Sequence, residues 1–402
     1  MPYNRRGSLF GDEEIAALTK LLQGNETLSG GPQREGFEAE FAEYLGVRHA
    51  VSTTSCTVAL ELATYLIGFR PGDVVIATPQ TYWASLNPLL DLEVEVRFCD
   101  IDANSLNLDP QYLSSLICPR TRAIYLVHYG GLMSDMGAIL RIAKAHGLLV
   151  LEDCAHAHGS KYRGKRAGAL GDIGCYSFQS MKNISTLGEG GMITFNNSIW
   201  HEILLRLREG EPDATFVERT STNIGPYYKP TSLDRHEKNA YTHDCTQIRR
   251  HGTNAILSEP AALIGRLQLE KLPTLVERRR AIAGQLNEAV SNIDGLRIQE
   301  EPPGYFHSYH LYTFFIEPNS GIDHDTLLIE MDTAGVEMQV RYFPLHLLPE
   351  WRLRGGTPGQ CPVAERIWFE QQINLPIYPT LTSDQVQFMI AAVRRAVMRA
   401  RK

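Results

Sequence analysis

Residues 123–151 read AIYLVHYGGLMSDMGAILRIAKAHGLLVL, and this stretch decides the fold class. Short apolar runs stand at its two ends, and the residues between them have the length and mixed polarity of an amphipathic helix. Ser134 or Asp135 can cap the start of that helix, and Gly147 can end it. A strand, a crossover helix and a second strand in this order predict two parallel strands of one sheet.

Two further apolar runs lie upstream, at Val74 to Ala77 and at Val94 to Phe98. Together with Ala123 to Val127 and Leu148 to Leu151, they are typical of buried strands in a mainly parallel sheet. We therefore expect an α/β fold, in which helices flank a mixed but mainly parallel sheet.

The C-terminal part of the chain opens with a long helical segment. This helix begins near Ser258, with Pro260 just inside it, and we expect Pro273 to kink or divide it. We place a large domain at residues 1–274 and a smaller α+β domain at residues 275–402. The predicted strands of the smaller domain are His310 to Ile316 and Glu337 to Tyr342, and its predicted helices are Thr326 to Ala334, ended by Gly335, and Thr382 to Arg399.

Residues 210–248 interrupt the regular pattern of the large domain. This polar stretch is rich in Thr, Asn, Pro and aromatic residues, and it is too long for an ordinary connection inside a compact domain. We interpret it as an insertion loop.

The composition excludes several classes of protein. The chain has 402 residues, 43% of them hydrophobic, and its net charge of -7 leaves no basic surplus for binding nucleic acid. We find neither a signal-peptide pattern nor an apolar run long enough to span a membrane. The seven cysteines are scattered and include no CxxC pair, which argues against a disulfide framework. We expect a cytoplasmic protein with no nucleic-acid or membrane partner.

A polar segment that begins with Glu152 and Asp153 follows the last strand of the opening stretch. Ligands of open α/β sheets bind at the carboxyl ends of the strands. Asp153 can merely cap the next turn, or it can ligate a metal together with His156 and His158, which are suitable ligand types. A third interpretation requires a partner further along the chain.

That partner is Lys182, which stands between a short strand near Ser177 and the glycine-rich turn at residues 188–191. Most lysines are solvated. A lysine set between two sheet strands is partly removed from water, and desolvation lowers its pKa toward that of a nucleophilic amine. Lys182 is therefore a candidate for forming an imine with a carbonyl compound.

Seven segments occur in a characteristic order: Gly30–Pro32 with Phe37–Gly46, Ser55–Leu60, Thr81–Ser85, Glu152–His156, Ser177–Lys182, Gly188–Gly191, and Gly252–Asn254 with Ala261–Gly265 and Gln268–Leu272. On these segments the chain resembles the DegT/DnrJ/StrS family of sugar aminotransferases, which are pyridoxal 5′-phosphate enzymes of fold type I. The resemblance covers residues 10–400 apart from 210–248. Each segment alone is weak evidence, whereas seven in register are specific.

The resemblance implies roles for several side chains. Lys182 would bind the cofactor covalently and then move the proton between substrate and cofactor. Asp153 would pair with the pyridine nitrogen of the cofactor and keep it protonated, so that the ring can accept electrons. His156 would lie near the phenolic oxygen of the cofactor. Tyr82 would stack on the ring, and the adjacent Trp83 is a candidate for the same place.

The phosphate group of the cofactor requires converging donors. By resemblance, Thr57 and Val58 would open a helix whose backbone N–H groups point at the anion, and Ser177 would add a hydroxyl. An ordinary helix cap at this position is equally compatible with the sequence. Asn254 would reach the phosphate from a neighbouring subunit, so the resemblance implies a homodimer with shared active sites.

Three positions depart from the family pattern. Cys56 stands where glycine is common, Ile256 where arginine is common, and Arg341 where histidine is frequent. These departures weaken the prediction of the substrate and leave the prediction of the cofactor nearly unaffected.

The resemblance implies transamination between two small molecules. The amino donor would be glutamate or glutamine, and the acceptor a keto-sugar, nucleotide-linked, in amino-sugar or secondary-metabolite biosynthesis. A keto-cyclitol acceptor would use the same catalytic residues. Two other classes stay open: a sugar lyase or dehydratase, in which histidine replaces the lysine, and a non-catalytic regulator that binds the cofactor.

Overall fold

The computed structural model describes residues 1–3, 5–210, 213–216 and 246–401. These residues form two compact units, the first made of residues 1–197 and 257–402 and the second of residues 198–256. Asn254 belongs to the second unit, and the other predicted site residues belong to the first.

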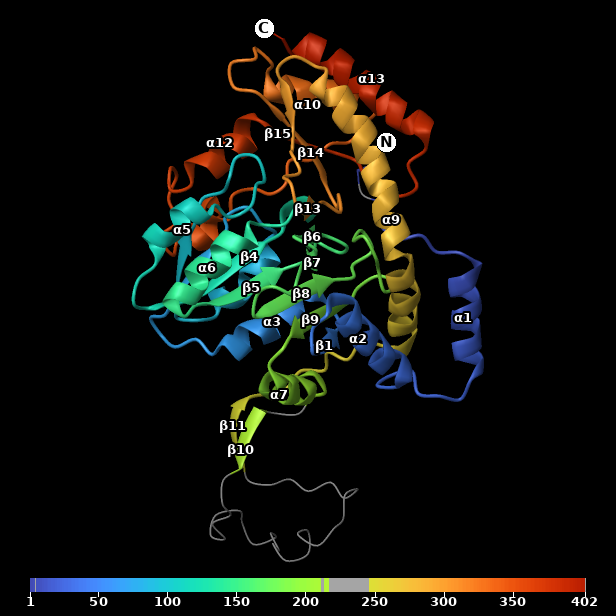
Figure 1. Ribbon diagram of the computed structural model, residues 1–402, viewed down its shortest axis with the longest axis vertical. Helices are drawn as coiled ribbons and strands as arrows, with labels where there is room; N and C mark the ends of the chain where they lie inside the picture. The colour runs from blue at the N-terminus through green and yellow to red at the C-terminus, as the bar shows by residue number, and fades with distance from the viewer. Residues whose placement is uncertain (4, 211–212, 217–245, 402) are drawn as a thin grey trace, which may run out of the picture. The chain divides into compact units, whose positions relative to one another are not determined.

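A seven-stranded sheet forms the centre of the first unit (Figure 1). In order across the sheet, its strands are β1 (His49–Thr53), β9 (Gly191–Phe195), β8 (Ile173–Ser177), β5 (Leu149–Asp153), β4 (Thr121–Val127), β2 (Val74–Ala77) and β3 (Glu95–Phe98). Strand β9 runs antiparallel to both of its neighbours, whereas β8, β5, β4, β2 and β3 are parallel to one another. The predicted mixed but mainly parallel sheet is confirmed.

The helix predicted in the opening stretch is α6 (Met136–His146). The Asp135 carboxylate caps it by accepting a hydrogen bond from the Ala138 N–H at 3.1 Å, and Gly147 ends it in the left-handed conformation. The other helices of this region are α1 (Asp12–Gln23), α2 (Pro32–Leu45), α3 (Cys56–Ile67), α4 (Asn87–Leu90) and α5 (Pro110–Leu116), with the 3-10 turns η1 (Trp83–Ser85) and η2 (Tyr129–Gly131).

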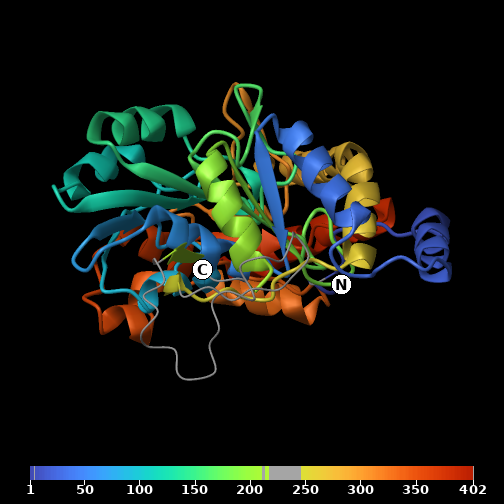
Figure 2. The same cartoon turned by 90° about the horizontal axis from the view of Figure 1, so that it is seen from below.

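Helices cover both faces of the central sheet (Figure 2). Leu126 of β4 belongs to the same buried cluster as Ile139 of α6, on one face. The preceding Tyr125 points to the opposite face, where its hydroxyl donates a hydrogen bond to Thr64 Oγ1 of α3 at 2.9 Å. Burial on both sides explains why this strand is apolar throughout.

A second hydrophobic cluster lies in the C-terminal part of the first unit, around a three-stranded antiparallel sheet in the order β12-β14-β15. Helix α9 joins the two clusters, because Leu275 packs in the first and Ile282 in the second. The elements are α9 (Glu259–Ser291), β12 (Leu296–Ile298), β14 (Tyr312–Ile316), α10 (His324–Thr333), η3 (Leu345–Leu347), α11 (Pro349–Arg352), α12 (Pro362–Glu370), β15 (Gln372–Leu375) and α13 (Ser383–Ala400).

A small sheet connects the two parts of the first unit. Its strands, in the order β13-β6-β7, are β13 (Tyr305–Phe306), β6 (Lys161–Tyr162) and β7 (Lys165–Arg166).

One expectation about the C-terminal part is wrong and a second is wrong in part: Pro273 was expected to kink or divide the helix, and only the division is contradicted. Residues 337–342 do not form a strand, because only Gln339 pairs with Asn374 and the N–H of Arg341 bonds instead to the Asn374 side chain, at 2.9 Å. Pro273 does not divide α9, which continues as one helix because Leu272 and Leu275 on either side are buried in the first cluster.

The second unit contains α7 (Ser198–Arg208) and an antiparallel pair of strands, β10 (Asp213–Phe216) and β11 (Thr246–Arg250). The strands lie at the ends of the expected insertion at residues 210–248, most of which falls outside the described residues.

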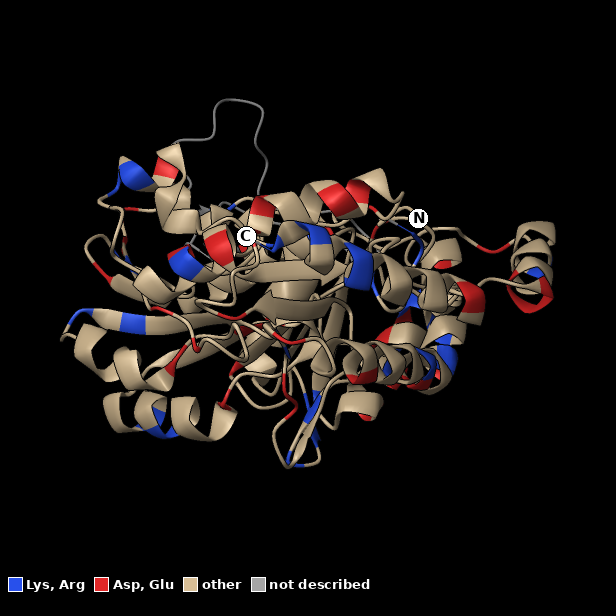
Figure 3. Ribbon diagram, turned by 90° about the horizontal axis from the view of Figure 1, so that it is seen from above, with Lys and Arg blue, Asp and Glu red and all other residues tan. Residues whose placement is uncertain are grey.

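Acidic and basic residues are interspersed along the described helices and loops (Figure 3). Within the described ranges, no helix combines the length and the apolar character needed to cross a membrane.

Candidate functional site

The carboxyl end of β5 carries Asp153, which is 5% exposed. Its Oδ2 accepts a hydrogen bond from Ser85 Oγ at 2.5 Å, and its Oδ1 accepts one from the Ala155 N–H at 2.9 Å. Ser85 stands at the end of η1, where it also contacts Thr81 at 2.7 Å. The carboxylate is therefore fixed in direction at the edge of the sheet where ligands of α/β proteins bind.

Lys182 lies in the loop that joins β8 to its antiparallel neighbour β9. Burial lowers the pKa of its amine to about 8; Asp153 opposes this shift, and the charge of Arg341 adds to it. Among the described residues, no carboxylate lies within ion-pair distance of Lys182 Nζ. At pH 7 roughly a tenth of Lys182 is then an uncharged, nucleophilic amine, a fraction roughly a few hundred times that of an ordinary lysine.

Backbone hydrogen bonds hold the loop that carries Lys182. Its N–H donates to the Gln179 carbonyl at 2.8 Å, and the N–H of Gly7 donates to the Ser180 carbonyl at 3.0 Å. A Cβ atom at Gly7 would lie 1.8 Å from the Lys182 carbonyl oxygen, so only glycine permits this approach. The N-terminal segment therefore helps to position the lysine loop.

His156 lies close to the same edge, and its ring is buried. Its Nδ1 accepts a hydrogen bond from the Gly130 N–H at 3.3 Å, and its Nε2 lies 3.0 Å from the Tyr342 hydroxyl. Burial, followed by the charges of Lys182 and Arg341, holds the His156 pKa well below its usual value. The ring is neutral, so Nε2 carries the proton and donates to Tyr342.

Helix α3 begins beside these groups. The Ser55 side chain accepts a hydrogen bond from the Val58 N–H at 3.3 Å, so the ordinary helix cap is present. Burial raises the pKa of the Cys56 thiol; Asp153 raises it further and Lys182 lowers it, which places the start of α3 within reach of both charges. Thr57 and Val58 thus stand in the first turn of a helix near Lys182, as expected, and Ser177 ends β8.

Tyr82 and Trp83 are both partly exposed, at 47% and 54%. The two rings touch, with centroids 5.0 Å apart, and the Tyr82 ring lies 5.9 Å from that of Tyr342. Because Tyr342 bonds to His156, Tyr82 is the one of the two with a ring contact to the site. Which of them stacks on the cofactor stays a prediction.

Asn254 lies in the second unit, where it forms a β bridge with Glu209. Its contact with a cofactor phosphate in a neighbouring subunit stays a prediction.

The metal interpretation of Asp153, His156 and His158 receives no geometric support. The side chains in the described ranges that converge closely enough to hold an ion are His128, Glu152 and Cys154 instead. His158 packs between aromatic rings, and burial lowers its pKa to about 3.

The structure places four further side chains beside the predicted site that the sequence did not identify: Ser85, Tyr342, His310 and Tyr3. Ser85 and Asp153 are 68 positions apart, and the sequence contains no signal that pairs them. His310 lies in a predicted strand, and its ring centroid is 4.4 Å from that of His156. The only sequence feature that pointed to the surroundings of Tyr342 and His310 is Arg341, which stands where the family frequently has histidine.

A family model described as the DegT/DnrJ/EryC1/StrS aminotransferase family matches residues 9–394. The chain belongs to this family. Membership confirms the expected fold, the aminotransferase class and pyridoxal 5′-phosphate as the cofactor.

Individual relatives resemble the chain over nearly its whole length. It is 34% identical over 401 residues to the spore coat polysaccharide biosynthesis protein SpsC of Bacillus subtilis, covering 99% of this chain and 97% of that protein. It is 32% identical to the dTDP-3-amino-3,4,6-trideoxy-alpha-D-glucose transaminase of Streptomyces venezuelae, covering 95% and 91%. The crystal structure of the aminotransferase TlmJ from Streptoalloteichus hindustanus matches with a TM-score of 0.84 and 30% identity, over 99% of both chains.

The side chains of the site suit this cofactor. Lys182 offers an amine for its aldehyde, and the buried Asp153 offers a carboxylate for its ring nitrogen. The first turn of α3 has no acidic side chain that would repel a phosphate, and its Val58 N–H donates to the Ser55 side chain in this structure.

Proposed function

We propose that this aminotransferase moves an amino group from glutamate or glutamine to a nucleotide-linked keto-sugar. The donor loses its amine and becomes a keto acid, and the acceptor ketone becomes an amine, so no external oxidant or reductant is consumed. The observation that carries the proposal is the Lys182 amine, whose pKa is lowered to about 8, near the fixed carboxylate of Asp153.

Bound pyridoxal phosphate supplies an electron sink that stabilises negative charge on an adjacent carbon. Lys182 Nζ would hold the cofactor and, when it is not bonded to it, would accept the proton lost by the donor carbon and supply the proton gained by the acceptor carbon. Asp153 keeps the proton on the cofactor ring nitrogen, and Ser85 orients that carboxylate through its 2.5 Å hydrogen bond.

Other side chains hold the cofactor without moving protons. We assign the phosphate to Thr57 and Val58 in the first turn of α3 and to the Ser177 hydroxyl. His156 orients the phenolic side of the ring, and Tyr82 covers its face.

The keto-sugar acceptor rests on the relatives rather than on the pocket. The Streptomyces venezuelae relative is named for a dTDP-linked amino sugar. A keto-cyclitol is the rival acceptor, because the same catalytic residues would serve it. A dehydratase is disfavoured by the presence of Lys182.

We also propose a homodimer in which Asn254 completes the partner's phosphate site, and a lobe boundary within α9 near residue 275. The change of hydrophobic cluster between Leu275 and Ile282 supports this boundary. A cytoplasmic location is proposed from the cysteines, since the six that the structure describes are all free.

The test is a product assay. Purified protein is incubated with glutamate or glutamine and a panel of nucleotide-linked keto-sugars and keto-cyclitols, and amine products are detected by mass spectrometry. We expect amination of a keto-sugar by the native protein and none by Lys182→Ala. Amination of cyclitols alone would replace the acceptor, and biological function retained by Lys182→Ala would support the non-catalytic regulator.

A further inference from the structure

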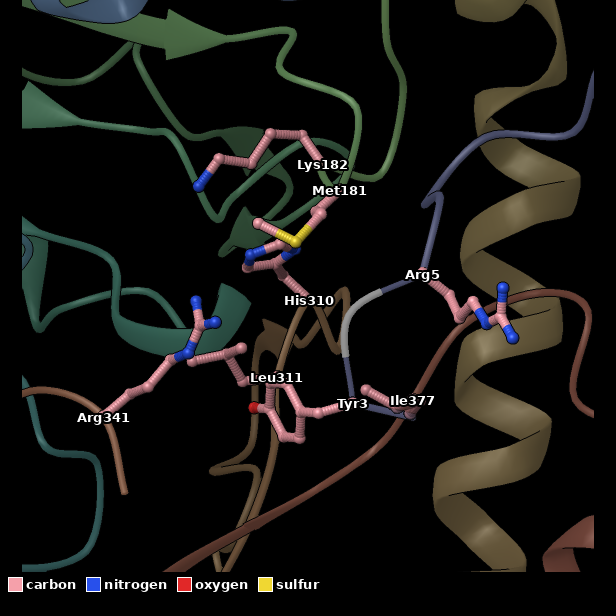
Figure 4. Close-up of a pocket in the computed structure, with 8 residues that line it drawn as sticks. All are labelled: Tyr3, Arg5, Met181, Lys182, His310, Leu311, Arg341 and Ile377. Carbon is pink, nitrogen blue, oxygen red and sulfur yellow. The ribbon is translucent and has the colours of Figure 1, made fainter. Parts of the chain in front are cut away.

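A cavity of about 400 Å³, counting the part open to solvent, lies beside Lys182 (Figure 4). Three segments that are distant in sequence build its wall: the N-terminal segment with Tyr3, the lysine loop, and the C-terminal lobe with His310 and Arg341. No acidic side chain of the described residues lines it. The cavity is therefore suited to an anion.

Arg341 brings a fixed positive charge into this cavity. Its guanidinium lies over the rings of Tyr3 and Tyr342, at 5.2 and 5.7 Å from their centroids, and its Nη1 lies 3.4 Å from the Tyr342 hydroxyl. Its Nε donates to the Gln339 side chain. A guanidinium held in this way offers a fixed positive charge to a carboxylate that enters the cavity.

Tyr3 presents a buried hydroxyl that has no hydrogen-bond partner among the described residues. The backbone N–H of Tyr3 is anchored to the Glu337 carboxylate at 2.8 Å, which holds the ring against Arg341. Unpartnered buried hydroxyls are rare in folded proteins, and a bound ligand is one explanation. Arg5 also lines the cavity, but its guanidinium points away from Lys182 and Arg341 (Figure 4).

The chemistry of the two substrates distinguishes which anion fits. In an amino acid, a single carbon separates the amine from the α-carboxylate, so a group that binds this carboxylate must line the same cavity as Lys182. In a nucleotide-linked keto-sugar, several bonds separate the ketone from the phosphates. Only the amino donor places a negative charge so close to the reacting nitrogen.

We propose that Arg341 and the Tyr3 hydroxyl bind the α-carboxylate of the amino donor. This assignment rests on the proposed transamination, and it makes both residues determinants of donor specificity. The keto acceptor does not need this contact.

The test separates the two halves of the reaction in Arg341→Gln. Single-turnover conversion of the cofactor by the donor is followed by absorbance, and the return reaction starts from protein loaded with pyridoxamine phosphate and a keto-sugar. We expect the donor half to slow roughly 10- to 100-fold with both glutamate and glutamine, the loss typical of a charged hydrogen bond. The acceptor half, measured at the pH optimum of each protein so that the effect of the Arg341 charge on the Lys182 pKa is matched, should slow much less than the donor half. Tyr3→Phe should show a smaller loss in the donor half only.

Binding is measured separately with α-methylglutamate, which lacks the proton that transfer requires. Its dissociation constant should rise by the same factor in Arg341→Gln and stay at the native value in Arg5→Gln, the matched charge-removal control. Thermal melts of all variants report whether the fold is retained.

Several outcomes would overturn the proposal that Arg341 and Tyr3 bind the donor carboxylate. Equal slowing of both half-reactions, or of neither, removes Arg341 from donor binding. A loss with glutamate but not with glutamine would assign Arg341 to the side-chain carboxylate of glutamate instead. If the native protein itself fails to aminate any acceptor, the proposed function fails, which is a distinguishable result.

Discussion

Glu152 and Asp153 are adjacent carboxylates of β5, yet they serve two different regions of the molecule. Glu152 is fully buried and accepts hydrogen bonds from His128 Nε2 at 2.8 Å and from the N–H groups of Gly168 and Leu170 at 3.0 Å. It ties β4 and the loop after β7 to β5, so its role is structural.

Asp153, one residue later, points to the opposite side of the strand. It accepts two hydrogen bonds, from Ser85 and Ala155, and its charge acts on Lys182. Alternation along the strand turns one carboxylate toward the protein interior and the next toward the site. Substitution of the first should change stability, and substitution of the second should change chemistry.

Asp153→Asn is expected to give the largest loss of activity. The amide cannot keep the cofactor ring nitrogen protonated, so transamination should fall roughly 10²- to 10³-fold, the range for losing one electrostatic contact in an active site. Steady-state rates and thermal melting would be compared with the native protein. A large drop in melting temperature with normal activity per folded molecule would reverse the roles of the two carboxylates.

Glu152→Gln should instead destabilise the fold. The amide would present N–H donors where a carboxylate oxygen now accepts hydrogen bonds from His128 and Gly168, and each buried donor left unpaired costs about 1–3 kcal/mol. Denaturant unfolding measures this loss. The double variant with His128→Gln serves as the control, because it removes both partners and should recover part of the loss. Unchanged stability in the single variant would contradict the structural role.

Glu152 also predicts the pH dependence of stability. Burial raises its pKa, but the hydrogen bond and charge of His128 and the amides of Gly171 and Gly168 bring the pKa below the usual value of 4.5. Its stabilising contribution is therefore complete above pH 4.5 and is lost as the pH falls through the folded-state pKa. Unfolding measured from pH 7 downward should show a shallower acid loss in Glu152→Gln, and identical curves would count against this origin.

Ser85→Ala should have a smaller effect than Asp153→Asn. It removes one of the two hydrogen bonds that orient the carboxylate, while the Ala155 N–H remains, so we expect a loss of about 10-fold in activity. Ser85→Thr, which keeps the hydroxyl, should retain more activity than the alanine variant. Equal activity of all three proteins would show that Ser85 does not position Asp153.

The smallest expected effect is a shift in the pH dependence of the rate in Arg341→Gln. The charge of Arg341 adds to the lowering of the Lys182 pKa, so its removal should move the acid limb of the rate profile to higher pH. The profile is measured with saturating donor. A shift to lower pH, or none, would mean that the charge of Arg341 does not act on Lys182.

Local and repeated features of the sequence predicted the fold. The four apolar runs form β2, β3, β4 and β5. Helix α6 begins after Asp135 and ends before Gly147, as predicted, because helix caps depend on neighbouring residues alone. Pro273 and residues 337–342 were misjudged because contacts with distant residues outweighed local preference there.

The same contrast between local sequence features and contacts with distant residues applies to the predicted site. Lys182 and Asp153 could be proposed from the sequence because each lies in a segment with a recognisable order of residue types, and their roles stay predictions. The Ser85 bond to Asp153 and the approach of Tyr3 to Arg341 join residues far apart in sequence, and only the folded chain brings them together.

The most direct test of the central claim is to reduce the native protein with borohydride and to map the modified peptide by mass spectrometry. Visible absorption of the bound cofactor should disappear on reduction, and pyridoxyl phosphate should be found on Lys182, with no such adduct in Lys182→Ala. Absence of the chromophore, or attachment to a different lysine, would contradict the central claim.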